Sequence, residues 1–151
     1  MERLEAALKQ VQEGLTTIIE TINTVAKEKF PGRFTVLPDG WVKDNQLGID
    51  WGPTHSKKVD WEEAKTACDK SGGRLPTVPE LFSLVDRKKH DPAIVDGGEA
   101  LQMKTDDWYW SSESCAWSQD LAWFVYFFSG GYVGSDFKGN DFYVRPVRSS
   151  K

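Results

Sequence analysis

The segment RLPTVPEL at residues 74–81 decides the fold, because it follows the end of one predicted helix and begins another. Thr77 can act as an N-cap, Glu80 stands three positions later as in a capping box, and Pro79 is tolerated in a first helical turn. This spacing predicts a helix over about residues 78–89. The residues of this helix expected to face the core are Leu81, Leu84 and Val85.

A second capped helix is predicted directly before this segment. Asp60 can cap its start, Glu63 stands three residues later, and Gly72-Gly73 ends it. We therefore expect a helix near residues 60–71. Its apolar face consists of Trp61, Ala64, Ala67 and Cys68.

Short strands are predicted on both sides of the two helices. They are separated by turn signals, of which Ser129-Gly130-Gly131 predicts a hairpin. The sequence therefore predicts an α+β fold with small antiparallel sheets and two flanking helices. The expected strands lie at about residues 34–37, 41–42, 47–51, 108–112, 122–128, 132–133 and 142–148.

The N-terminal segment at residues 1–30 predicts a separate amphipathic helix over about 2–29, which Phe30-Pro31-Gly32 ends. Its apolar residues repeat at spacings of 4 and 3, which is an a/d seam. Self-association through this seam favours a trimer or tetramer, because β-branched residues occupy d, whereas packing on the chain's own body gives a monomer. Gly14 within the helix and the sparse charges at e and g favour packing on the body over self-association, and both alternatives predict burial of Leu8, Val11, Leu15, Ile18 and Ile22.

Composition excludes several classes of protein. The net charge of −4 argues against nonspecific nucleic-acid binding, and no apolar stretch is long enough to insert into a membrane. Cys68 and Cys115 cannot form a metal cage alone, and only His55 and His90 could join them, so we expect no metal and no cofactor. No secretory signal is visible, which leaves localisation open.

Aromatic residues gather in the C-terminal third of the chain. Thirteen of the nineteen lie between residues 108 and 143, with Ser and Gly between many of them. Such a mixture is typical of antibody paratopes, in which rigid aromatic side chains supply contact area at a small entropic cost. We expect this region to carry the function.

Several blocks of this chain, taken together, resemble a C-type-lectin-like domain family. This family supplies ligand-binding domains to bacterial, archaeal and viral surface proteins and to the variable proteins of diversity-generating retroelements. The resemblance covers about residues 33–148 and implies that the C-terminal strands and their loops face the ligand. The blocks that carry it are FTVLPDGWVKDNQLGIDW (34–51), WEEAKTACDKSGGRLPTVPELFSL (61–84), YWSS (109–112), AW (122–123) and YVRPVR (143–148).

The resemblance also implies which positions vary. In retroelement variable proteins, Asn codons of the AAY type are rewritten at adenines, which can yield Phe, Tyr, Ser, Asp, Gly, Cys, Leu or Ala but not Trp, Gln, Glu or Lys. The residues that fit this set, and are predicted to bind ligand, are Phe124, Tyr126, Phe128, Ser129, Tyr132, Gly134, Ser135, Asp136, Phe137, Gly139 and Asp141. Those that do not fit, and are predicted framework, are Trp117, Gln119, Trp123 and Lys138.

Alternation along residues 123–128 makes both faces of the expected strand apolar. One interpretation buries both faces, and the other leaves one face exposed as an aromatic platform. The platform interpretation predicts a contiguous solvent-facing surface of Phe124, Tyr126, Phe128, Tyr132, Ser135, Asp136 and Phe137. It predicts that Trp123, Val125, Phe127 and Val133 are buried beneath.

Other chemistries find little support in the sequence. Asn140-Asp141 lacks the partner loop of calcium-dependent lectins, and Cys68 and Cys115 are not the close pair used by formylglycine-generating enzymes of related fold. Two hypotheses remain. One is a non-enzymatic, diversified receptor for a protein or other macromolecule on another cell or virus, and the other is a non-diversified module that assembles through the N-terminal helix.

Overall fold

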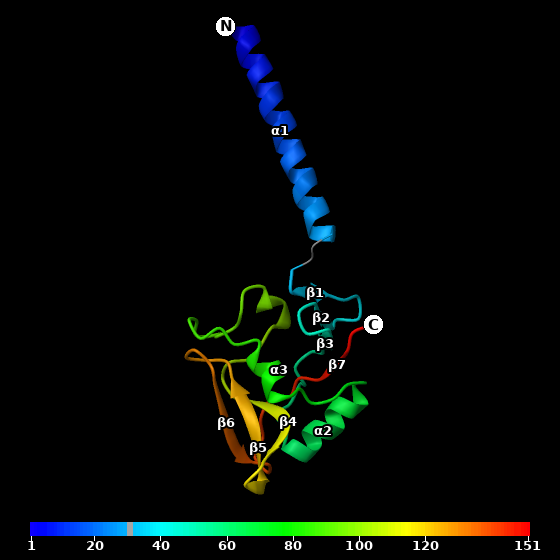
Figure 1. Ribbon diagram of the computed structural model, residues 1–151, viewed down its shortest axis with the longest axis vertical. Helices are drawn as coiled ribbons and strands as arrows, with labels where there is room; N and C mark the ends of the chain where they lie inside the picture. The colour runs from blue at the N-terminus through cyan, green and yellow to red at the C-terminus, as the bar shows by residue number, and fades with distance from the viewer. Residues whose placement is uncertain (30–31) are drawn as a thin grey trace. The chain divides into compact units, whose positions relative to one another are not determined.

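The computed structural model describes residues 1–29 and 32–151 of the chain. Two compact units make up the protein, Met1–Gly32 and Arg33–Lys151. The first unit is built on α1, a single helix over Glu2–Lys29 (Figure 1). The heptad-based prediction of this helix is confirmed, whereas its predicted stop at Phe30-Pro31 lies outside the described residues.

The apolar seam of α1 is exposed in the single chain. Its seven a and d side chains between Leu4 and Val25 are each 52–62% exposed. Within its own unit, Met1–Gly32, α1 is a single helix and cannot cover this stripe, so the predicted burial, on the body or between copies of the chain, stays a prediction. The residues concerned are Leu8, Val11, Leu15, Ile18 and Ile22. Within the described residues, no helix combines the length and the hydropathy needed to cross a membrane.

The second unit holds two small antiparallel sheets, which confirms the α+β class. The first sheet has the strand order β1-β2-β3-β7 and the second has the order β4-β5-β6 (Figure 1). The strands of the first sheet are β1 (Phe34–Val36), β2 (Val42–Asp44), β3 (Ile49–Trp51) and β7 (Val147–Ser149). Those of the second are β4 (Tyr109–Cys115), β5 (Ser118–Tyr126) and β6 (Tyr132–Phe137).

Helix α2 spans Trp61–Lys70 and begins as predicted. The Asp60 carboxylate accepts a hydrogen bond from the backbone N–H of Glu63 at 2.9 Å, which satisfies one of the unpaired amides of the first turn. The buried face of this helix consists of Trp61, Ala64 and Cys68, with Ala67 half-buried.

Helix α3 spans Val78–Phe82 and carries the predicted capping box. The Glu80 carboxylate accepts from the backbone N–H of Thr77 at 2.8 Å, and the Thr77 hydroxyl accepts from the backbone N–H of Glu80 at 3.3 Å. The Arg74 guanidinium donates to both oxygens of Glu80 at 2.8 Å. Residues 74–81 thus fix the start of α3, which lies against β4 and β5.

The prediction that this helix continues to about residue 89 is wrong. After the C-cap at Ser83, Val85 forms an isolated β-bridge with Ile94, and the carbonyl of Leu84 accepts the N–H of Val95 at 2.9 Å. This tertiary pairing satisfies backbone groups that further helical turns would have used. Residues 87–89 therefore lie outside the helix. A short 3₁₀ helix, η1, follows over Gly98–Leu101.

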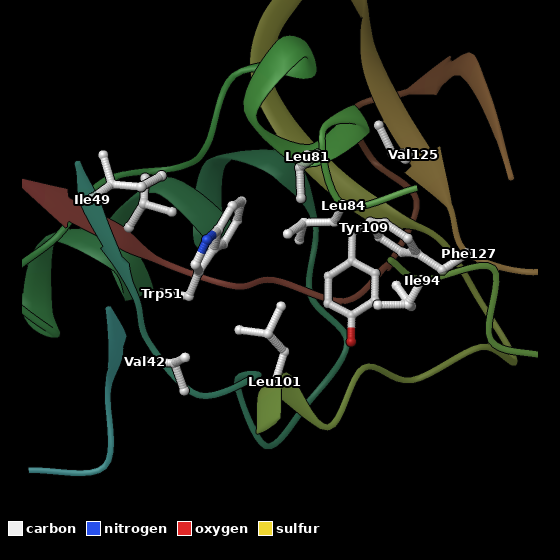
Figure 2. Close-up of a cluster of buried hydrophobic side chains, with 11 residues drawn as sticks. Val42, Ile49, Trp51, Leu81, Leu84, Ile94, Leu101, Tyr109, Val125 and Phe127 are labelled. Carbon is white, nitrogen blue, oxygen red and sulfur yellow. The ribbon is translucent and has the colours of Figure 1, made fainter. Parts of the chain in front are cut away.

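Two clusters of buried side chains form the core of the second unit. The first joins the first sheet, α3 and the second sheet, and Figure 2 shows its packing. The second joins α2 to the second sheet. Strand β5 supplies Val125 to the first cluster and Phe124 to the second, so both faces of this strand are buried near its C-terminal end.

Candidate ligand-binding surface

The β5–β6 hairpin sets which aromatic side chains share a face of the second sheet. Phe124 pairs with Gly134, and Tyr126 pairs with Tyr132. Residues directly opposite each other in an antiparallel pair point to the same side, so these four lie on one face. The opposite face carries Trp123, Val125, Val133 and Ser135.

A tight turn closes this hairpin at the predicted place. Ser129, Gly130 and Gly131 have φ angles of 47°, 79° and 70°, in the left-handed region that favours glycine. A Cβ atom on Gly131 would lie 2.5 Å from Cγ1 of Val85. The turn therefore packs tightly against the segment that follows α3, which fixes the end of the hairpin.

Four aromatic residues beside this turn form what we call the aromatic array: Trp108, Tyr126, Phe128 and Tyr132. The indole N–H of Trp108 donates to the Tyr132 hydroxyl at 3.1 Å, and the rings of Tyr126 and Tyr132 meet edge to face at 5.2 Å. The ring of Phe128 lies 6.0 Å from that of Tyr126. All four side chains are half-buried or exposed, so the array presents fixed rings to solvent.

Phe124 lies beneath the array rather than within it. Its ring stacks on that of Trp108 at 4.0 Å with an interplanar angle of 4°, and only 4% of the residue is exposed. The ring of Phe142 supports Trp108 from another side at 4.8 Å. The prediction that Phe124 is solvent-facing is therefore wrong, because Trp108 covers it.

Gly134 makes room for this buried ring. A Cβ atom at Gly134 would lie 2.5 Å from Cζ of Phe124. Gly134→Ala is therefore expected to lower the free energy of unfolding by about 1–3 kcal/mol, as overpacking does, in chemical denaturation of the full chain. Gly139→Ala is the matched control, because nothing lies within 4 Å of its Cβ position. Equal stability of the two variants would contradict the packing described for Phe124.

The remaining predicted site residues divide between the two sheet faces. Val133, predicted to be buried, is 36% exposed, and Phe137 is 63% exposed on the same side as Ser135. Trp117, 67% exposed, meets half-buried Trp123 edge to face on that side. The predicted single surface is thus wrong, because the period-2 alternation of β6 sends Phe137 and Ser135 away from Tyr132.

The structure places the other candidates as follows. Tyr126 and Phe128 are half-buried in the array, and Val125 and Phe127 are buried beneath it as predicted. Asp136 shares the array's side of β6. The exposed candidates in turns are Ser129, Gly139 and Asp141.

Carboxylates lie around the array and affect its phenols. Burial, the neighbouring phenol of Tyr132 and the charges of Asp107, Asp106 and Asp91 raise the pKa of Tyr126. A hydrogen bond to Asp106 at 2.7 Å raises the pKa of neighbouring Tyr143 to about 12. Tyrosine hydroxyls already keep their protons near neutral pH, and these upward shifts extend that state to higher pH, so the Tyr126 hydroxyl can donate to a ligand.

Neither cysteine is placed for chemistry. Cys68 and Cys115 are free and buried, and burial raises the pKa of the Cys68 thiol to about 12. A thiol with such a pKa is not an effective nucleophile near neutral pH. No group of three or more His, Cys, Asp or Glu residues within 1–29 and 32–151 could hold a metal ion.

Comparison with known families assigns this domain. The Lcl C-terminal domain family matches residues 40–148, which are most of the chain and include the whole aromatic array. The chain belongs to this family. The C-type-lectin-like resemblance seen in the sequence is thereby confirmed, and with it the coarse function of a ligand-binding domain. No curated protein matches the chain.

Sequence reasoning missed one member of the array of this Lcl C-terminal domain. Trp108 was expected only as a strand residue, yet its indole joins Tyr132 to the buried ring of Phe124. The available signal was the register, because Trp110 pairs with Phe124 and Trp108 stands two residues away on the same side. Using it requires knowing that β4 pairs with β5.

Proposed function

We propose that this Lcl C-terminal domain is a non-enzymatic receptor whose aromatic array binds a macromolecular ligand, most simply a protein on another cell or virus. The observation that carries the proposal is the construction of the array. Fixed aromatic rings reach solvent over a buried layer that contains Phe124, Phe142 and Trp110. Rigid Tyr and Trp side chains lose little entropy on binding, which is why paratopes use them.

The proposal extends to diversification by a retroelement. Tyr126, Phe128, Ser129 and Tyr132 fit rewritten AAY codons and lie on or next to the array. Such rewriting does not produce Trp, so Trp108 within the array and Trp110 in the buried layer beneath it would stay constant. Constant tryptophans among and beneath the variable positions let the ligand surface change while the fold persists.

Sequencing around the gene tests this part of the proposal. We expect a reverse transcriptase gene nearby and a near-copy of the 3′ end that differs from it at adenines. The differing codons should include those of Tyr126, Phe128 and Tyr132 and exclude that of Trp108. An isolated gene without such a copy would refute diversification and would leave ligand binding to the experiments below.

Alanine variants of the array test ligand binding. For a partner recovered by panning displayed protein fragments on the immobilised chain, Tyr126→Ala or Phe128→Ala should weaken binding by roughly 2 kcal/mol or more, about 30-fold in Kd. Both changes should leave the unfolding free energy within about 1 kcal/mol of the parent, because both side chains are half-buried.

Trp117→Ala is the matched control for this measurement, because Trp117 is an exposed aromatic on the opposite face of the sheet. It should leave the Kd unchanged. A partner that loses affinity with Trp117→Ala but keeps it with Tyr126→Ala would place the ligand surface on the other face and refute the assignment to the array.

A further inference from the structure

We propose that α1 is a coiled-coil segment through which three or four copies of this chain associate. The observation behind the proposal is the seam of α1, seven apolar side chains that are each more than half exposed in the single chain. This inference does not depend on the proposed function, because it concerns the unit outside the Lcl C-terminal domain match.

The spacing of the seam identifies its occupant as a second helix of the same kind. From Leu4 to Val25 the apolar residues follow one another at intervals of 4 and 3 without interruption. A helix that packs on a globular surface needs only a broad stripe with a period of 3.6. A strict repeat of 3.5 keeps a narrow seam facing a supercoiled partner helix, which is the signature of a coiled coil.

The residue types at the seam favour more than two strands. Leu8, Leu15 and Ile22 occupy a, and three of the four d positions are β-branched (Val11, Ile18 and Val25). This combination shifts coiled coils from dimers toward trimers and tetramers. Ile19 at an e position is 57% exposed and widens the apolar face on one side of the seam, as bundles of several helices require.

The positions that flank the seam carry few charges. Association of identical chains therefore brings few like charges close to one another. Up to Val25, the residues at e and g are Glu5, Ala7, Gln12, Gly14, Ile19 and Thr21. The hydroxyl of Thr21 donates to the carbonyl of Thr17 at 2.9 Å within the helix. A satisfied hydroxyl can enter an interface without leaving a polar group unpaired.

The size of the exposed stripe supports the same conclusion. The seam from Leu4 to Val25 is about 32 Å long, so at a width of about 10 Å it covers on the order of 300 Å². That area is already comparable with the largest apolar patch of a typical monomer, and such patches mark interaction sites. Copies of the chain supply a matching seam of the same length.

Sedimentation equilibrium of the full chain tests the proposal. We expect a mass three or four times the 17.1 kDa of one chain. The double variant Leu15→Asp, Ile18→Asp places charges in the seam and should reduce the mass to that of one chain. The control variant Thr16→Asp, Thr17→Asp changes the neighbouring positions outside the seam and should keep the parent mass.

Tryptophan fluorescence shows whether each variant still folds. All seven tryptophans lie in the second unit, so their thermal melt reports that unit alone, and it should remain a cooperative transition in both variants. A parent of one or two chain masses would overturn the proposal. So would an oligomer that survives the seam variant, because its interface would then lie elsewhere.

Discussion

Phe127→Ala is expected to lower the free energy of unfolding by about 3–5 kcal/mol in chemical denaturation of the full chain. Phe127 is fully buried in the first core cluster, and its ring meets that of Tyr109 edge to face at 5.5 Å (Figure 2). Its carbonyl also accepts the N–H of Ala93 at 2.8 Å, which fixes the backbone around it. The surrounding side chains thus have little freedom to fill the cavity.

The neighbouring residue provides the matched control. Phe128→Ala removes the same side chain one position later, where it is half-buried in the aromatic array, and should change the unfolding free energy by about 1 kcal/mol or less. Phe124→Ala should resemble Phe127→Ala, because Phe124 is buried beneath Trp108. Equal losses at Phe127 and Phe128 would mean that the array is part of the core and would refute its role as a surface.

Asp44→Asn is expected to lower the unfolding free energy by about 3–5 kcal/mol at neutral pH, because it leaves a partly buried cation without its partner. The buried carboxylate of Asp44 accepts from Nε and Nη2 of Arg33 at 3.0 and 2.9 Å, and from the indole of Trp51 at 3.1 Å. Arg33 also donates to the carbonyl of Ser83 at 2.9 Å. The carboxylate therefore joins the first sheet to the end of α3.

The effect of this substitution should depend on pH. Burial by itself raises the pKa of Asp44, but hydrogen bonds from Arg33, Trp51 and Leu47 outweigh it and hold the pKa below its ordinary value of 3.8. A lowered pKa contributes stability that is fully present above the unfolded-state value and is lost as the pH falls through the folded-state value. The difference in stability between parent and Asp44→Asn should therefore shrink below about pH 4.

Denaturation curves at several pH values measure this dependence. Asp96→Asn is the control, because Asp96 is exposed and its ion pair with Lys89 lies at the surface. This change should leave stability near that of the parent at every pH. A difference between parent and Asp44→Asn that stays constant down to about pH 2 would show that the charge of Asp44 does not carry the effect.

Local chemistry made most of the secondary structure predictable. The caps at Asp60 and Thr77 depend on hydrogen bonds within four residues, so sequence spacing was sufficient to locate both helix starts. The end of α3 was not predictable in this way, because it depends on the bridge between Val85 and Ile94, which tertiary packing creates. The Ser129-Gly130-Gly131 turn has positive φ angles, which depend on the residue types in the turn itself. The hairpin was therefore predictable from the sequence.

The candidate site was predicted only in part, because it too depends on tertiary packing. Alternation correctly buried Val125 and Phe127 and correctly left Tyr126 and Phe128 toward solvent. It failed at Phe124, because alternation tells which side a residue faces and not whether another ring, here that of Trp108, covers that side.

The apolar seam of α1 shows a different limit of sequence reasoning. Its heptad predicted the helix correctly, since an uninterrupted amphipathic repeat without Pro is local information. Which partner covers Leu15 and Ile18 is not local, because copies of a chain and the chain's own body both offer apolar surface.

A comparison of two displayed libraries tests the central claim, that the aromatic array is an adaptable ligand surface. One library varies Tyr126, Phe128, Ser129 and Tyr132, and the other varies the same number of exposed positions on α2 (Glu62, Glu63, Thr66 and Asp69), with both panned against lysozyme as an arbitrary protein target. We expect the array library to yield folded variants that bind lysozyme, and we expect this binding to disappear when the selected residues are changed back to the parent residues. The α2 library should yield few binders or none. Equal yields, or binders from α2 alone, would contradict the account.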